Sequence, residues 1–437
     1  MPPSSSPPSN MDIDTPPTPP PTPEDEANAT DSLATPSASA DAASKHPNMK
    51  LAQDIHRAIM LSTNELEPEE ASAAGISPGL ISAIEKTIGD EIENPSLYRS
   101  CAQSQLSAFS AKTEEQLKAL ESKNKETLAE LEQKVEEAKE KAGDMEVLDA
   151  RFAVARFCAK SLSKDEALEA YDKVLNLPKL SSGKTIDALM EAARVASFHG
   201  DTKKNKEMID RAVKLANDGG DWDRRNRLKV YNALSKLLAR DVKTAASLLV
   251  DCIATFSCNE LCTYTDFIMY TVISNLLYLP RTELKEKIID GPEIITVVHE
   301  VPTVSKLANA LYECDYAGYL EGVVAIRPIL VADRFLRPHA GYIVRELHVL
   351  GYKQFLDSYK SVTLESMAKS FGVGTQFLDL QLSRFIAAGR LTAKIDKYGG
   401  VVETNRPDLK NAQYRDMIQK GDLLLNRIQK LARVVDL

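Results

Sequence analysis

Residues 337–404 contain three helical patterns followed by two short β patterns, and no other stretch limits the possible folds as strongly. In the first pattern apolar residues recur every three to five positions, which puts them on one face of a helix. The second begins after Thr363, a residue type that caps helices, and ends at Gly372. The third runs from Gly374 to Gly389. This order of elements predicts a winged helix.

The two β patterns predict the hairpin, or wing, of this module. Apolar and polar residues alternate around Ile395, and the tip at Tyr398–Gly400 holds two glycines, which supply the positive φ that a tight turn needs. An exposed hairpin strand can pair with a strand of another chain. We therefore predict a protein interface at Ile395, Tyr398, Val401 and Val402.

The third helix argues against sequence-specific DNA binding. A helix that reads a DNA groove needs several Arg, Lys, Asn or Gln side chains directed at bases and phosphates. Between Gly374 and Gly389 the only ionisable residues are Asp379 and Arg384. The apolar face of this helix is better suited to contact with another protein.

Residues 1–47 form a tail of different composition. They hold twelve of the 22 prolines and hardly any large apolar residue, so we expect this segment to be disordered. Seven acidic residues in the tail account for most of the net charge of −9. The rest of the chain therefore has no strong overall attraction for nucleic acid or for an anionic membrane.

The chain from residue 48 to residue 333 is expected to be helical throughout. Residues 48–103 contain N-terminal helices, and residues 104–143 are rich in Glu, Lys, Ala and Leu and predict one long charged helix. Its apolar seam is thin, which favours a solvated helix between modules over a two-stranded coiled coil. From 144 to 333, pairs of apolar stripes separated by glycine turns predict an irregular α-solenoid, similar to tetratricopeptide (TPR) repeats but without a strict period of 34. The β-branched run at Ile294–Val298 is expected to be an extended connector.

The last segment, residues 408–437, predicts one more amphipathic helix. Leu424, Ile428, Leu431 and Val435 recur at intervals of three, four and seven residues. We expect this stripe to dock into a bundle formed with other chains. The alternative is that the helix folds back onto its own winged helix.

No sequence motif indicates catalysis or a cofactor. The chain has no GxxxxGK[ST], GxGxxG, HExxH or GxSxG pattern, and its six histidines are scattered. Its six cysteines form no CxxC pair and fit reduced thiols in a cytosolic or nuclear protein. We therefore expect a mainly α binding protein, not an enzyme, with no metal and no cofactor.

Helical pairs that lead into a winged helix resemble the PCI family, whose members include subunits of the proteasome lid, the COP9 signalosome and translation initiation factor three. The segments that resemble the lid subunits most closely are RFAVARFCAKSL (151–162), GDTKKNKEMIDRAVKL (200–215), GVVETNRPD (400–408) and the terminal GDLLLNRIQKLARVVDL. The domains expected from the sequence are a tail at 1–47, helices at 48–103 and 104–143, a TPR-like region at 144–333, the PCI winged helix at 334–405 and a docking helix at 408–437.

The resemblance implies a non-catalytic subunit of the lid of the proteasome 19S regulatory particle, present in cytoplasm and nucleus. Its winged helix would lie beside those of other PCI subunits, and its last helix would enter a bundle that supports lid assembly. The partners implied are other lid PCI subunits, the lid deubiquitinase module and the ATPase ring. Two alternatives are a PCI subunit of the COP9 signalosome and a PCI adaptor that binds nucleic acid.

Overall fold

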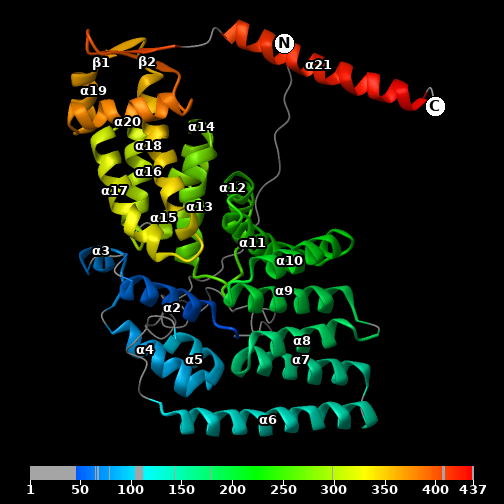
Figure 1. The fold of residues 1–437 in the computed structure, drawn as a ribbon. Coiled ribbons are helices and arrows are strands. Elements are labelled where there is room, and N and C mark those ends of the chain that lie inside the picture. Colours follow the sequence, from blue (N-terminus) through cyan, green and yellow to red (C-terminus); the bar gives the residue numbers. More distant parts are fainter. Residues whose placement is uncertain are drawn as a thin grey trace, which may run out of the picture. The chain divides into compact units, whose positions relative to one another are not determined.

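The computed structural model describes residues 46–437 except 64, 66–67, 78, 104–111, 142, 179, 298, 406–408 and 436–437. The tail predicted at 1–47 thus lies almost wholly outside the described residues. Helices make up most of the described chain, and its strands are short (Figure 1). The predicted fold class, a helical-repeat region followed by a winged helix and a terminal helix, is confirmed.

The N-terminal helices pack as a small cluster. They are α2 (Met49–Ser62), α3 (Pro68–Ala73), α4 (Leu80–Lys86), the π-helical turn η1 (Thr87–Ile92) and α5 (Pro95–Gln103). Ile84, Ile88 and Tyr98 are buried between them together with Leu117 of the next helix. This shared burial joins the cluster to the helix that follows.

The long charged helix is shorter and less solvated than the sequence predicts. It is α6 (Glu114–Lys141); Lys112 and Thr113 precede it, and residues 104–111 lie outside the described part. Leu117, Asn124 and Val135 are buried, and α6 packs along α7. These three positions, seven and eleven residues apart, form one narrow face. Leu117 packs with the N-terminal helices, Asn124 donates a hydrogen bond to the carbonyl of Glu93 (2.9 Å), and Val135 lies in the core with α7. This face is therefore covered, in contrast to the predicted solvated spacer.

Antiparallel helix pairs follow, each packed on the next (Figure 1). They are α7 (Asp144–Ser161), α8 (Lys164–Leu175), α9 (Ser182–Phe198), α10 (Thr202–Asn217), α11 (Trp222–Leu238), α12 (Val242–Val250) and α13 (Tyr264–Tyr278). Ser181, Asp201, Asp241 and Thr263 each begin a helix by accepting a hydrogen bond from a backbone N–H three residues on. Small side chains on α9 such as Ala192, Ala193 and Ala196 are fully buried and let neighbouring helices approach closely.

A second set of helices leads to the winged helix. These are α14 (Arg281–Leu284), η3 (Lys285–Ile289), α15 (Pro292–Val297), α16 (Pro302–Glu313) and α17 (Tyr316–Ala332), with the 3₁₀ turns η2 (Ile253–Thr255) and η4 (Arg337–His339). The extended connector predicted at Ile294–Val298 is instead helix α15. Ile294 and Val297, three residues apart, are buried on one side of it, a contact that favours the helical spacing.

The winged helix comprises α18 (Ala340–Leu356), β1 (Ser361–Thr363), α19 (Leu364–Phe371), α20 (Thr375–Ala387), β2 (Ala393–Asp396) and β3 (Val401–Thr404). The sheet order is β1-β3-β2, with both pairings antiparallel. Thr363 caps α19 as predicted, and Gly372 and Gly400 have positive φ. Strand β1 was not predicted, because three residues are too few to show a pattern and only pairing with Val401–Glu403 makes them a strand.

A buried carboxylate joins three distant segments of the chain. Asp333 accepts hydrogen bonds from Tyr270 Oη (2.6 Å) on α13, Gln53 Nε2 (2.8 Å) on α2, and the backbone N–H groups of Phe335 (2.9 Å) and Leu336 (3.0 Å). Next to it, Arg334 donates to the carbonyl of Phe198 at the end of α9 (2.9 Å). We call this cluster the Asp333 junction.

We predict that stability falls as pH drops from about 7 to 4, because two histidines near this junction are held neutral. Burial first, and then nearby cations that include Arg334, lower the pKa of His56 and of His199 from 6.5 to about 4. Between pH 6.5 and 4 the unfolded chain therefore binds protons that the folded chain does not, so stability is complete above pH 6.5 and is lost below it. We expect a loss of about 3 kcal/mol for each histidine, or roughly 6 kcal/mol in total, measured by urea unfolding at a series of pH values.

The matched variant is His56→Gln with His199→Gln, which should flatten this pH dependence. Burial raises the pKa of Asp333, which contributes with the opposite sign in acid and is present in both proteins. An unchanged slope in the double variant would contradict the assignment to the histidines.

Candidate interaction surfaces

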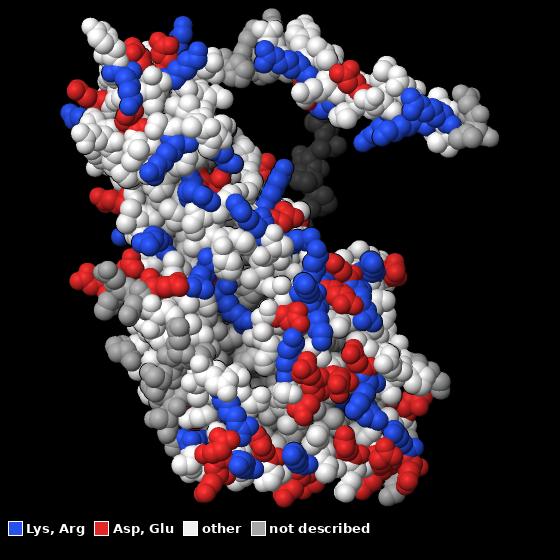
Figure 2. Space-filling model, in the orientation of Figure 1, with Lys and Arg blue, Asp and Glu red and all other residues white. Residues whose placement is uncertain are grey.

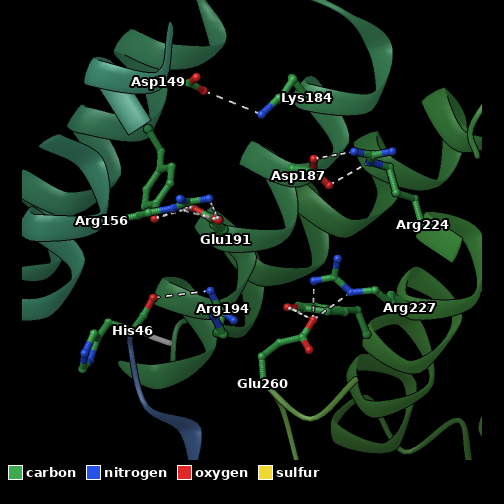
Figure 3. A network of polar contacts seen from close by, with 12 residues as sticks. His46, Asp149, Arg156, Lys184, Asp187, Glu191, Arg194, Arg224, Arg227 and Glu260 are labelled. Atoms are coloured by element: carbon green, nitrogen blue, oxygen red, sulfur yellow. Dashed lines mark hydrogen bonds and ion pairs between the residues drawn. The ribbon is translucent and has the colours of Figure 1, made fainter. Parts of the chain in front are cut away.

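A row of charged side chains crosses the first helices of successive pairs (Figure 3). Arg156 on α7 forms an ion pair with Glu191 on α9 (Nη2 to Oε1, 2.8 Å), and Tyr171 Oη also donates to Glu191 (3.0 Å). Asp187 on α9 accepts two hydrogen bonds from Arg224 on α11, both 2.9 Å long. These pairs bridge neighbouring repeats along one side of the solenoid, and we call them the ion-pair row.

The ion-pair row continues to the segment before α13 and has a regular spacing. Arg227 pairs with Glu260 at 2.6 Å. The paired residues are 35 positions apart for Arg156 and Glu191, 37 for Arg224 and Asp187, and 33 for Arg227 and Glu260. The apolar stripes predict only a degenerate repeat. A period close to one helix pair is nevertheless present in the charged residues, and their spacing was the signal that sequence reasoning missed.

We assign the ion-pair row a structural role. Its buried carboxylates are neutralised by arginines, and burial, with the charge of Glu191 and Glu260 respectively, raises the pKa of Tyr171 and of Tyr231. Within the described residues no group of three His, Cys, Asp or Glu side chains could hold a metal ion. The ion-pair row therefore fixes the register of the repeats.

The hairpin places the four predicted interface residues differently from one another. Tyr398 is fully exposed at the tip, where its N–H bonds Asp396 Oδ1 (3.0 Å), and Ile395 is half-buried on β2. Val401 and Val402 lie on β3, which is the middle strand because β1 pairs with its other side. Val402 is buried in the core of the winged helix. The outer strands of the sheet are β1 and β2, so Ile395 lies on an edge strand, whereas Val402 lies on the middle strand and is not at the surface. Partner contacts at Ile395, Tyr398 and Val401 stay predictions.

Helix α20 presents a second apolar surface. Leu378 and Leu382 face the core, whereas Phe377 and Leu380, three residues apart, are 46% and 49% exposed. Beside them Asp379 and Lys397 of the wing form an ion pair (3.4 Å). The sequence indicated an apolar helix, but only the structure separates its inward residues from its outward ones.

The terminal helix α21 (Leu409–Val435) is the most exposed apolar element of the described chain. Leu424, Ile428 and Leu431 are 56–63% exposed, and every side chain described in α21 is exposed. The side chain of Val435 lies outside the described residues. Docking into a bundle with other chains and folding back on the winged helix both stay predictions.

Most apolar residues of α21 form one broad stripe, and the exposed Leu423 and Val434 lie outside it, beyond Leu431. At 3.6 residues per turn, Leu431 and Ile418 mark its edges, which are about 140° apart around the helix. The stripe consists of Tyr414, Met417, Ile418, Gly421, Leu424, Leu425, Ile428, Leu431 and Ala432. A two-stranded coiled coil needs only a narrow seam, so this width fits contact with two or more helices. We refer to it as the α21 stripe.

No helix in the described part of the chain combines the length and the apolar character needed to cross a membrane.

Three family models match the chain in order. They are "26S proteasome subunit RPN7" at residues 113–287, "PCI domain" at 326–406 and "26S proteasome regulatory subunit RPN7/PSMD6 C-terminal helix" at 413–435. The PCI match begins within α17, and the third match covers most of α21.

Three relatives illustrate the similarity. The chain is 45% identical over 309 residues to the 26S proteasome non-ATPase regulatory subunit 6 homolog of Arabidopsis thaliana, covering 69% of this chain and 78% of the relative. It is 38% identical over 303 residues to the 26S proteasome regulatory subunit RPN7 of Saccharomyces cerevisiae, covering 68% and 70%. The COP9 signalosome complex subunit 1 of Arabidopsis thaliana is 26% identical over 230 residues, covering 52% and 50%.

We predict that Val402→Ala destabilises the winged helix by about 2 kcal/mol, because it leaves a cavity in the core. The matched control is Val401→Ala, its neighbour on the same strand with a half-buried side chain, for which we expect less than about 1 kcal/mol. Urea unfolding monitored by circular dichroism measures both. Equal effects would contradict the placement of Val402 in the core.

Proposed function

This chain belongs to the 26S proteasome subunit RPN7 family, and from that premise we propose that it is a non-catalytic scaffold subunit of the lid of the proteasome 19S regulatory particle. The observation that carries the proposal is the match of three family models in chain order, from the repeats to the terminal helix. Its contribution to ubiquitin-dependent protein degradation is to hold other subunits in position.

The described residues support a positional role through their polar groups. The buried ionisable groups of the ion-pair row and of the Asp333 junction already have internal partners. A catalytic centre would instead require a nucleophile and a base within hydrogen-bond reach of each other at an accessible site. The proposed activity is therefore binding, with no cofactor and no metal.

Two surfaces of the winged helix are suited to neighbouring subunits. The outer edge of β2 offers backbone groups that a strand of another chain can pair with, and Tyr398 extends beyond it. Phe377 and Leu380 on α20 offer a separate apolar contact. Because the two surfaces differ, contacts through them would be heterologous and would arrange PCI subunits side by side.

The α21 stripe is proposed as the docking element for lid assembly. Full burial of a large aliphatic side chain contributes about 1.5–3 kcal/mol, and the stripe exposes several of them, including Leu424, Ile428 and Leu431. Such surface favours burial against helices of other chains. Its partners are proposed to be the terminal helices of other lid subunits.

The proposal also covers the partners of the chain and its place in the cell. The partners would include other lid PCI subunits, the lid deubiquitinase module and subunits of the ATPase ring, in cytoplasm and nucleus. A COP9 signalosome subunit is the second candidate, but that relative matches only about half of the chain at lower identity. A nucleic-acid adaptor is less favoured, because the outward face of α20 presents Phe377 and Leu380 where a reader presents cations.

We predict that Leu424→Asp with Ile428→Asp prevents incorporation of the full-length chain into the lid, because two charges would have to be buried in the bundle. The tagged chain is purified gently from its own cells, and the co-purifying proteins are quantified by mass spectrometry. We expect near-equal amounts of lid and ATPase subunits with the unchanged chain and a loss of at least about tenfold with the variant.

The matched control is Asn426→Asp, an exposed residue of the same helix on the side away from the α21 stripe, which should assemble normally. Recovery of signalosome subunits with the unchanged chain would contradict the proposed complex. Normal assembly of the double variant would contradict docking through α21.

A further inference from the structure

The charges of α21 are distributed unevenly along the helix. Its first half carries charges of both signs, namely Lys410, Arg415, Asp416, Lys420 and Asp422. Asp416 forms an ion pair with Lys420 (2.7 Å). The second half, from Leu423 to Val435, carries Arg427, Lys430 and Arg433 and no acidic residue. On the face drawn in Figure 2, blue side chains stand on the second half of α21 without red ones beside them.

These cations have no ion-pair partner among the described carboxylates. Arg427 and Lys430 take part in no described hydrogen bond or ion pair. A cation in the last turn stabilises a helix by interacting with its dipole, which accounts for Arg433. Arg427 and Lys430 lie too far from the end for this effect, which fades within one turn. No contact among the described residues accounts for the charge of Arg427 and Lys430.

Arg427 and Lys430 lie beside the α21 stripe. At 3.6 residues per turn, Arg427 lies about 40° beyond Leu431, at one edge of the stripe, and Lys430 lies about 60° further round. In helix bundles, residues that flank the apolar seam form ion pairs with the neighbouring helix and determine which partner is accepted. A helix that packs against the Leu431 edge would bring its own flanking residues opposite Arg427 and then Lys430.

We propose that the second half of α21 binds an acidic amphipathic helix of a partner subunit, whose Asp or Glu side chains pair with Arg427 and Lys430. This inference rests on the proposed function and adds the chemistry of the partner. The charge complementarity makes the contact selective, because a neighbouring helix with basic flanks would place like charges together.

An anionic membrane surface is the other ligand class for a basic amphipathic helix. The α21 stripe is less suited to it. Gly421 and Ala432 lie near the middle of the stripe, where small side chains allow a second helix to approach closely, and α21 has no tryptophan or phenylalanine. The observations therefore favour a protein helix.

The test uses the assembled complex, purified through the tagged full-length chain. A carbodiimide joins a lysine amine to a carboxylate only where the two are in contact, so we expect Lys430 to become linked to Asp or Glu on a helix of a partner subunit. Lys430→Arg keeps the charge but removes the reactive amine, and it should remove this cross-link while assembly stays normal.

A charge reversal provides the second measurement. Arg427→Glu with Lys430→Glu should reduce incorporation by about tenfold or more, and the remaining complex should dissociate at lower salt. The matched control is Lys118→Glu with Lys125→Glu on the exposed side of α6, which makes the same change in net charge and should have no effect. Because all four side chains are exposed, loss of folding is not expected, and circular dichroism checks this.

The outcomes separate this inference from the proposed function. If Leu424→Asp with Ile428→Asp blocks assembly while the charge reversal does not, and no cross-link forms, the acidic partner is overturned and docking stands. If both sets of variants assemble normally, both are overturned. Charge-dependent sedimentation of the chain with phosphatidylserine vesicles, without a cross-link in the complex, would also overturn the acidic helix.

Discussion

The Asp333 junction is the contact on which the arrangement of this chain most depends. A buried carboxylate without partners would cost several kcal/mol, and here it is satisfied only if α2, α13 and the start of the winged-helix region stay together. Gln53 contributes from a helix 280 positions earlier in the chain. The hydrogen bonds of this one carboxylate therefore link the N-terminal helices to the start of the winged-helix region.

Between these segments the repeats are held by contacts of short range. Small residues on α9 allow close packing, and each charged pair of the ion-pair row joins one repeat to the next. Such a structure is stabilised mainly by nearest-neighbour interfaces. The carboxylates of Glu191, Glu260 and Asp333 all have partners among the described residues.

Three surfaces, unlike the interior, expose apolar side chains or backbone groups. The α21 stripe, the Phe377 and Leu380 contact and the edge of β2 expose apolar or backbone groups that no described residue covers. A folded protein keeps such surface where another protein covers it. In such contacts, buried apolar side chains supply most of the affinity, and charges beside them supply selectivity. The basic second half of α21 would therefore select among partners.

The sequence by itself determined what depends on neighbours along the chain. Helical spacing, the Thr363 cap and the positive φ of Gly372 and Gly400 are local, so the winged helix and the terminal helix could be predicted. Tertiary structure alone decided which faces are covered. Pairing with β1 made β3 the middle strand, which places Val402 in the core. Helix α7 covers one side of α6. The ion-pair row joins residues about 35 positions apart in the sequence. These outcomes depend on segments far apart in the chain, and no local pattern encodes which of them will meet.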